Sequence, residues 1–351
     1  MSVADRRRFL ALALGAGATL GGWNLRAGWR REEGEAGQAA EETPPLPEET
    51  LHAVTRKSWA MGAGVSLTVL HARREVAGQA TVAALAELRL VERLMSLYRP
   101  DSQLCRLNRD RVLDRPHPYL VEVFRAAEVT SQQTAGAFDA TVQPLWDVYA
   151  AAQKAGGLPD EKAVEAARRK VDWRQVEIAA DRIRLYGDAT AITLNGIAQG
   201  FAADRMLSVL RRRDIRHALV NTGEIGTLGG KGRNAAWSVG IQHPRRDDVY
   251  LTLAKLEGRC LATSGDYATA FSDDRRDHHI FDPRTGHSPR ELASVSVAAA
   301  TATQADALST ALFVLGPDRG RKLLEATPGA DALFVLKDGA TLVTSGFPAS
   351  T

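Results

Sequence analysis

Cysteine is scarce in this sequence, and the scarcity excludes several classes of protein. The 351 residues include only Cys105 and Cys260. Two cysteines cannot build the multiple bridges of a small disulfide-stapled scaffold, and these two are too far apart in sequence for a Cys-x-x-Cys metal or redox motif. A single bridge between them is possible in an oxidising compartment, and the sequence leaves that question open.

Strong net charge is also missing. The formal net charge is only +3, and no basic stretch is interleaved with aromatic residues or carries zinc-finger spacing. Nucleic-acid binding is therefore not expected. The composition, with 44% hydrophobic and 25% charged residues, is that of an ordinary globular chain that can bury a sizeable core.

Two familiar nucleotide-binding motifs are incomplete. Gly-Ala-Gly at residues 62–64 is followed by Val-Ser-Leu, without the third glycine of a dinucleotide-binding turn. Gly-Lys at residues 230–231 is followed by Gly232 where a P-loop needs Ser or Thr. Neither a Rossmann domain nor a P-loop domain is predicted.

The amino terminus has the layout of a secretion signal. Three arginines at residues 6–8 precede Phe9, Leu10 and a run of apolar and small residues to about Gly22. The order Arg-Arg-x-Phe-Leu resembles a twin-arginine signal. Residues 1–25 are thus predicted to be an export signal or anchor, which would place the protein in the periplasm or at the outer face of the inner membrane. The alternative is a basic patch before a short buried helix.

An acidic, proline-rich segment follows the signal. Residues 32–50 contain seven Glu, no Lys or Arg, and the string Thr-Pro-Pro-Leu-Pro. Such a composition cannot bury enough apolar area to offset the loss of chain entropy. Residues 26–50 are therefore predicted to be a disordered linker, and residues 51–351 a single folded domain.

The rest of the chain mixes helical and strand patterns. Strands are expected in hairpin-like pairs, which favours an α+β domain with mixed, largely antiparallel sheets flanked by helices. Helices are predicted at 82–98, 119–134, 160–170, 198–213, 303–315 and 318–326. Strands are predicted at 176–179, 182–186, 191–194, 218–221, 237–242, 250–256 and 293–299, with a terminal hairpin at 338–339.

Glycine-containing polar segments recur along this domain. Glycine beside Asp, Thr, Ser or His is typical of places where the backbone closely approaches a ligand, although each such segment alone is more often a turn. The segments are residues 61–64, 136–141, 194–200, 222–225, 263–267 and 279–286.

The predicted helix after residue 302 carries oxygen ligands on one face. Asp306, Ser309 and Thr310 lie opposite a leucine face at 100° per residue. One carboxylate with hydroxyl or carbonyl oxygens suits Mg²⁺, which completes its coordination with phosphate and water. The alternative is an exposed polar face near the positive start of a helix.

A pair of histidines precedes a tight turn. His278 and His279 come just before Asp-Pro-Arg-Thr-Gly at residues 282–286, whose Pro and Gly restrict the backbone. A neutral imidazole held there can accept a proton from an attacking hydroxyl. The alternative is a solvent-facing loop histidine.

Taken in order, these segments resemble the signature blocks of the ApbE family, the FAD:protein FMN transferases, from about residue 57 to residue 345. The most specific blocks are residues 279–286 (His-Ile-Phe-Asp-Pro-Arg-Thr-Gly), 294–297 and 305–312. The resemblance implies an α+β fold, FAD as substrate and Mg²⁺ as the ion. It places Met61, Ala137, Phe138, Asp139, Thr193, Gln199 and Ile280 in the FAD site. It places Gly196, Asp306, Ser309 and Thr310 around the metal, and makes His279 and Asp306 the catalytic residues.

The resemblance is incomplete in two segments. The family pattern Asp-Leu-Gly-Gly-Ile-Ala-Lys-Gly appears at residues 193–200 as Thr-Leu-Asn-Gly-Ile-Ala-Gln-Gly, so Thr193 and Gln199 replace an acid and a base. The usual Gly-Gly-Asp appears as Thr-Gly-Glu at residues 222–224. We expect weaker flavin contacts here and an intact metal helix.

The implied function is Mg²⁺-dependent transfer of the FMN half of FAD onto a threonine of an acceptor, with release of AMP. Two alternatives use the same site: an FAD pyrophosphatase that yields free FMN and AMP, and a non-catalytic FAD-binding carrier. With an export signal, the expected acceptor is a periplasmic or membrane-bound redox protein.

Overall fold

The computed structural model describes residues 50–232 and 235–350. The predicted export signal and almost all of the predicted linker lie outside the described residues. Within them, no helix is long and apolar enough to cross a membrane.

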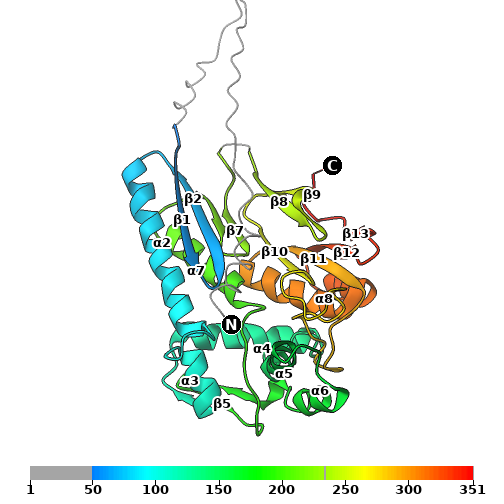
Figure 1. The fold of residues 1–351 in the computed structure, drawn as a ribbon. Helices are drawn as coiled ribbons and strands as arrows, with labels where there is room; N and C mark the ends of the chain where they lie inside the picture. Colours follow the sequence, from blue (N-terminus) through cyan, green and yellow to red (C-terminus); the bar gives the residue numbers. More distant parts are fainter. Residues whose placement is uncertain (1–49, 233–234, 351) are drawn as a thin grey trace, which may run out of the picture.

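The centre of the fold is an eight-stranded sheet in the order β1-β2-β6-β7-β10-β11-β12-β13, with every neighbouring pair antiparallel (Figure 1). Its strands are β1 (His52–Ala60), β2 (Ala63–His71), β6 (His217–Asn221), β7 (Ile225–Leu228), β10 (Cys260–Gly265), β11 (Leu292–Ala299), β12 (Asp331–Leu336) and β13 (Thr341–Val343). The predicted α+β domain with antiparallel sheets is confirmed.

Two smaller sheets and a set of helices complete the fold. The sheets are β3-β5-β4, from β3 (Val112–Asp114), β4 (Val176–Ile178) and β5 (Arg182–Leu185), and the hairpin of β8 (Trp237–His243) and β9 (Arg246–Leu256). The helices are α2 (Arg74–Met95), α3 (Gln103–Asp110), α4 (Pro118–Gln133), α5 (Gln143–Lys154), α6 (Glu161–Arg168), the 3₁₀ turn η1 (Trp173–Gln175), α7 (Ala198–Arg211) and α8 (Ala302–Glu325).

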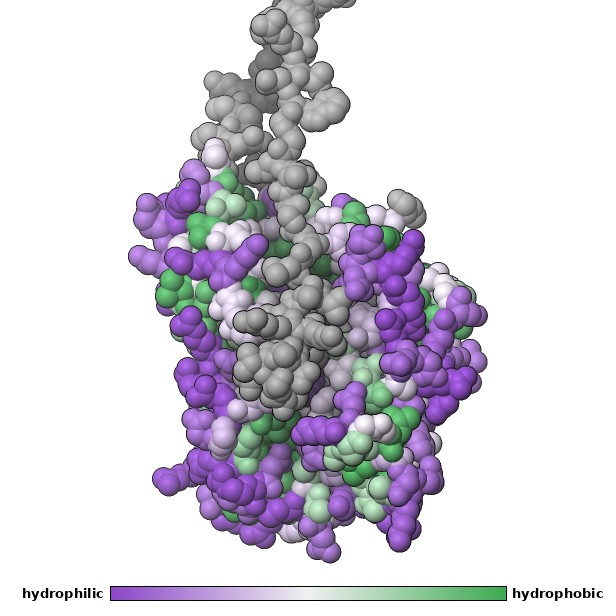
Figure 2. Space-filling model, in the orientation of Figure 1, coloured by the Kyte–Doolittle hydropathy of each residue, from purple (hydrophilic) through white to green (hydrophobic). Residues whose placement is uncertain are grey.

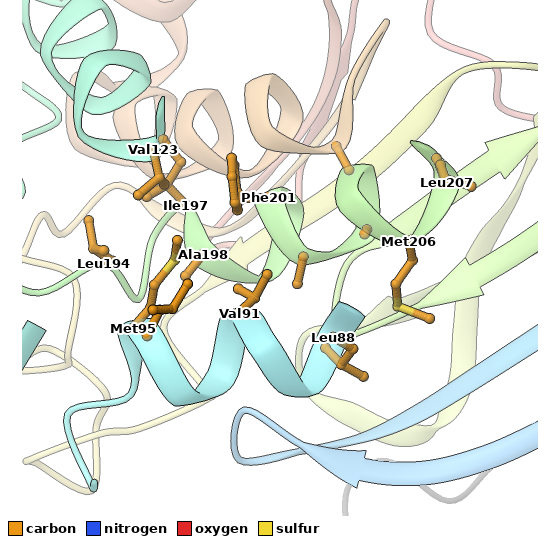
Figure 3. Close-up of a cluster of buried hydrophobic side chains, with 14 of the residues drawn as sticks. Leu88, Val91, Met95, Val123, Leu194, Ile197, Ala198, Phe201, Met206 and Leu207 are labelled. Carbon is orange, nitrogen blue, oxygen red and sulfur yellow. The ribbon is translucent and has the colours of Figure 1, made fainter. Parts of the chain in front are cut away.

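Helices α2 and α7 pack together beside the β1–β2–β6 end of the sheet. In α2, Leu88, Val91 and Met95 recur at helical spacing and are buried against α7. From α7, Phe201 and Met206 point into the same cluster (Figure 3). Each such buried side chain contributes about 1.5–3 kcal/mol by leaving water, so this contact fixes the start of α7.

Helix α8 and the β8–β9 hairpin cover opposite faces of the β10–β12 part of the sheet. On β11, Val295 and Val297 pack with α8, whereas Ala298 packs with the hairpin. This alternation follows from the two-residue period of a strand. It explains the Ser-Val-Ser-Val pattern at residues 294–297, in which only the valines face α8.

A second layer lies below the main sheet in the view of Figure 1 and contains α4, α5, α6 and β5. An aromatic cluster of Tyr149, Phe271 and Phe281 joins α5 to the loops that follow β10. The predicted hairpin at residues 176–186 is confirmed as β4–β5. The loop with the two histidines is therefore held between α5 and the main sheet.

Two details differ from the sequence-based expectation. Residues 191–194 do not form a strand, because the side chain of Asn108 bonds to both the N–H and the C=O of Ile192 and so replaces a strand neighbour. Helix α2 begins at Arg74, well before residue 82. The predicted break between the two helices after residue 302 is confirmed, because α8 is kinked at Gly316, where φ is 74°.

The two cysteines are both free. Cys260 is buried on β10 and Cys105 is half-buried on α3. The bridge that the sequence left open is therefore absent from the structure.

Candidate active site

One buried turn of α8 carries the predicted metal ligands. Asp306 is 4% exposed and Ser309 is 1% exposed, so the alternative of an exposed polar face is wrong. These side chains lie inside because α8 packs against both β10 and α7. We refer to Asp306, Ser309 and Thr310 as the metal turn.

Strand β10 adds a hydroxyl to the metal turn. The Ser264 Oγ lies 2.8 Å from the Ser309 Oγ and 3.3 Å from the Thr310 Oγ1. Ser309 also donates a hydrogen bond of 2.9 Å to the carbonyl of Asp306. Ser264 was not among the predicted ligands, although it belongs to the segment at residues 263–267, one of those predicted to approach a ligand.

The start of α7 supplies the other side. An added Cβ on Gly196 would lie 2.9 Å from the Thr310 Oγ1, so the backbone there directly adjoins the metal turn. The Gly200 N–H donates to the Asp306 Oδ2 at 2.8 Å. Gly200 is in the first turn of α7, where N–H groups have no carbonyl partner within the helix, so Asp306 caps this helix start.

The metal turn contains a buried carboxylate whose charge is poorly compensated by the protein. Burial raises the pKa of Asp306 to about 7, opposed by the Gly200 N–H and assisted by Asp204. Burial and the nearby Asp306 also raise the pKa of Glu224, which accepts a hydrogen bond from the Thr263 N–H at 3.0 Å. The described hydrogen-bond partners of both carboxylates are thus backbone N–H groups, and a cation would relieve this unbalanced charge.

Gly200 is required for this geometry. A Cβ on Gly200 would lie 2.2 Å from the carbonyl oxygen of Ala302 and 2.7 Å from the Cβ of Asp306. We therefore expect Gly200→Ala to lower the free energy of unfolding by about 1–3 kcal/mol or more, as overpacking of a core does. Chemical denaturation would measure it. Gly78→Ala, at a helical glycine with open space around it, is the matched control and should not destabilise the protein.

Of the two adjacent histidines, His279 has a ring nitrogen without a described partner. Its Nδ1 lies 3.1 Å from the carbonyl of Thr269, which can only accept a hydrogen bond, so the Nδ1 carries the hydrogen and the Nε2 of the neutral ring is left unprotonated. Burial lowers the pKa of His279. No described residue bonds to its Nε2, which is therefore free to accept a proton.

His278, by contrast, is fully engaged inside the protein. Its Nε2 donates to the carbonyl of Pro289 at 3.0 Å, and its Nδ1 accepts from the Ile280 N–H at 3.3 Å. Burial lowers the pKa of His278 to about 4. His278 is therefore a neutral structural residue, and the sequence prediction of His279 as the base is the one that the hydrogen bonds favour.

Of the residues predicted for the FAD site, Phe138 lies close to the metal turn. It is 3.4 Å from the Cβ position of Gly196, which in turn lies 2.9 Å from the Thr310 Oγ1. Ala137 and Ile280 belong to one buried cluster with Leu308, on the leucine face of α8. Their place in the FAD site stays a prediction.

Asp139 and Met61 have other contacts. The Asp139 Oδ1 accepts two hydrogen bonds from Thr141 and its Oδ2 accepts one from the Trp173 N–H. Burial raises the pKa of Asp139 to about 6. Met61, at φ 53°, donates its N–H to the Glu92 Oε1 and packs against the α2–α7 core. Both shape the backbone at their positions.

The two segments that depart from the family pattern contact each other. The Thr222 hydroxyl donates to the carbonyl of Gln199 at 2.9 Å. The Gln199 side-chain amide lies beside Gly223, within 2.6 Å of where a Cβ would stand. Thr193 bonds through its N–H to the carbonyl of Ala140. The two departing segments thus lie side by side, and the bond from Thr222 is made to the backbone of Gln199.

Known proteins share this arrangement of segments. The sequence model of the ApbE family matches residues 61–334. The chain belongs to the ApbE family. It is 32% identical over 279 residues to the FAD:protein FMN transferase of Treponema pallidum, an alignment that covers 73% of this chain and 76% of the relative. The FAD:protein FMN transferase of Escherichia coli K12 is 28% identical over 72% of this chain and 75% of the relative.

Solved ApbE structures have the same fold. The ApbE protein of Thermotoga maritima matches with a TM-score of 0.75 at 28% identity, over 84% of this chain and 97% of that one. The apo flavinyl transferase ApbE of Pseudomonas stutzeri matches with a TM-score of 0.71 at 28% identity, over 84% and 95%. The ApbE fold predicted from the sequence is confirmed.

The oxygen donors of the metal turn fit Mg²⁺ better than a transition metal. The described residues contain no group of three or more His, Cys, Asp or Glu side chains arranged to hold a metal ion. The donors here are one carboxylate with hydroxyl and carbonyl oxygens. Such a sparse, hard set matches an ion that keeps substrate phosphates and water in its coordination shell.

Proposed function

We propose that this flavin transferase uses Mg²⁺ to move the FMN half of FAD onto a threonine of an acceptor protein, releasing AMP. The observation that carries the proposal is the metal turn. Asp306 is buried there beside the hydroxyls of Ser264, Ser309 and Thr310, and its charge has no cationic partner among the described ion pairs.

The metal ligands proposed for this chain are the Asp306 carboxylate, the Thr310 and Ser309 hydroxyls and the Gly196 carbonyl. When bound there, Mg²⁺ would neutralise charge on the non-bridging oxygens of the FAD pyrophosphate. The protein's own part is to keep these oxygens in place. The Gly200 N–H holds the Asp306 carboxylate, and Ser264 holds the two hydroxyls.

His279 is proposed to accept the proton of the acceptor threonine. Its Nδ1 contact with Thr269 leaves the Nε2 as a proton acceptor, and its lowered pKa keeps the ring neutral near pH 7. The threonine oxygen then forms a bond to the FMN phosphorus, and the bond from that phosphorus to the AMP oxygen breaks. AMP leaves with the electron pair of that bond.

The flavin is proposed to lie near Gly196, where Phe138 approaches the metal turn. Ala137, Phe138 and Ile280 would provide apolar contact, with Thr193 and Gln199 at its polar edge. Met61 and Asp139 would act mainly through the backbone that they shape, because their described contacts lie within the protein.

Export is a further part of the proposal. The arginine cluster and apolar run at residues 1–25 favour transport by a twin-arginine-like signal, to the periplasm or the outer face of the inner membrane. The acceptor would then be a periplasmic or membrane-bound redox protein that presents a threonine.

Incubation of the protein with FAD, Mg²⁺ and a flavin-free acceptor tests the proposal. We expect covalent flavin fluorescence on the acceptor in a denaturing gel, together with AMP in the solution. Free FMN and AMP without labelling would identify a pyrophosphatase, and unchanged FAD would identify a carrier. Omission of the acceptor separates the first two outcomes, since a transferase then leaves FAD intact.

A further inference from the structure

An ion cluster forms around the buried Asp266, two residues along the chain from Ser264, which contacts the metal turn. Asp266 is fully buried and accepts two hydrogen bonds from Arg245, of 2.7 Å to its Oδ1 and 2.8 Å to its Oδ2. The Lys337 Nζ lies 3.5 Å from the same Oδ2. We refer to Arg245, Asp266 and Lys337 as the ion cluster.

The two cations come from different parts of the fold. Arg245 lies in the turn between β8 and β9, and Lys337 directly follows β12. Lys337 also donates to the carbonyl of Arg275 at 2.7 Å, and the guanidinium of Arg275 reaches the carbonyl of Pro244 at 3.4 Å. The ion cluster thus ties two hairpins to the loop at residues 266–279.

That loop connects the two halves of the candidate site. It leaves β10 after Gly265, one residue beyond Ser264, which contacts the metal turn. Further along it, the carbonyl of Thr269 bonds to both the N–H and the Nδ1 of His279. Asp266 therefore lies in the chain between Ser264, whose hydroxyl contacts the metal turn, and Thr269, whose carbonyl orients His279.

A buried ion pair is weak support for stability, because removing its charges from water costs about as much as their attraction returns. Its fixed bidentate geometry, however, specifies orientation. We propose that the ion cluster positions His279. The cluster holds the loop at residues 266–279, so that the base keeps a fixed position relative to the metal turn. This inference rests on the proposed role of His279 as the base.

The consequence for kinetics is specific. Displacing a base by about 1 Å can cost on the order of 10²-fold in rate. Binding of FAD should be little affected, because the ion cluster is not part of the metal turn or of the proposed apolar FAD contacts. Asp266→Asn should therefore lower kcat for FMN transfer about 10–100-fold and leave the KM for FAD nearly unchanged. Lys337→Gln removes only the more distant cation and should lower kcat by a smaller factor. Because it leaves the Arg245–Asp266 pair in place, this variant keeps the proposal testable if Asp266→Asn fails to fold.

Another ion pair of the same sheet provides the matched control. Arg259 and Asp331 lie 2.8 Å apart at the opposite end of β10, and both are partly buried. Asp331→Asn should lower the melting temperature without changing kcat. An equal loss of kcat in Asp331→Asn and Asp266→Asn would make the ion cluster a general stabilising contact and overturn the proposal.

Two further measurements separate this inference from the proposed function. The Asp266→Asn change should add little in a His279→Ala background, because residues that act through one group are not additive; a full additive loss would contradict it. Hydrogen–deuterium exchange needs no activity. Asp266→Asn should speed exchange at residues 267–279 and leave the metal turn protected, whereas unchanged exchange in that loop would refute the positioning role even if the wild-type protein transferred no FMN.

Discussion

Replacing Asp306 by asparagine should lower the rate of FMN transfer by about 10³-fold. The carboxylate is the one charged donor of the metal turn, and a bound divalent cation contributes several kcal/mol to such a transfer. Each 1.4 kcal/mol corresponds to about tenfold in rate. Asparagine keeps the size of the side chain, so the measured loss reports the charge. Initial rates of acceptor labelling at increasing Mg²⁺ concentrations would show whether excess metal restores activity.

The same substitution should change how stability depends on pH. Without metal, the Asp306 pKa rises from 3.8 in the unfolded chain to about 7 in the folded protein, so between these values the folded state holds a proton that the unfolded state lacks. The stability contributed by this proton is fully present below about pH 4 and is lost as pH rises through 7. Mg²⁺ should restore it above pH 7. In Asp306→Asn, the melting temperature should lose both this pH dependence and its response to Mg²⁺.

Asp318 offers a control on the same helix. It lies beyond the kink of α8 and is exposed. Asp318→Asn removes one carboxylate from α8 without touching the metal turn, and transfer activity should stay at the wild-type level. A wild-type rate in Asp306→Asn would remove the metal turn from the mechanism, whatever the behaviour of Asp318→Asn.

Helical periodicity was sufficient to find the metal turn but not its surroundings. The 100° spacing placed Asp306, Ser309 and Thr310 on one face, yet the same spacing fits an exposed polar face. The burial of that face depends on α7, whose Gly200 lets the two helices meet, and on β10, which delivers Ser264. Such contacts arise from tertiary pairing between distant segments, which a local pattern does not encode.

The apolar run at residues 191–194 shows a similar limit. Its residues alternate like those of a strand, and Ile192 and Leu194 are indeed buried. The predicted strand is nevertheless wrong, because the Asn108 side chain satisfies the backbone of Ile192 from α3. Residues 193–195, which are not paired in a sheet, then lead to Gly196 beside the metal turn. A loop rather than a strand is what allows this segment to reach the site.

The largest effect on the other side of the site is expected from His279→Ala. Loss of a general base typically costs about 10²- to 10⁴-fold in rate, and we expect kcat for FMN transfer to fall within that range. The affinity for FAD, measured by flavin fluorescence, should change little. In the wild-type protein, the rate should fall as pH drops through the His279 pKa, which lies below its ordinary value of 6.5, and this acid limb should be absent from the residual activity of His279→Ala.

The neighbouring His278 provides the control that shows which of the two histidines is the base. His278 bonds through both ring nitrogens to the protein and packs edge-on against Phe313, so His278→Ala should lower the melting temperature because two buried polar partners lose their hydrogen bonds. The His278 variant, assayed well below its melting temperature, should keep the acid limb of the rate profile. If instead His278→Ala removed that limb and His279→Ala kept it, the assignment of the base would be reversed. The tautomer inferred from the Thr269 carbonyl would then be wrong, because it is what leaves the His279 Nε2 free to take the proton.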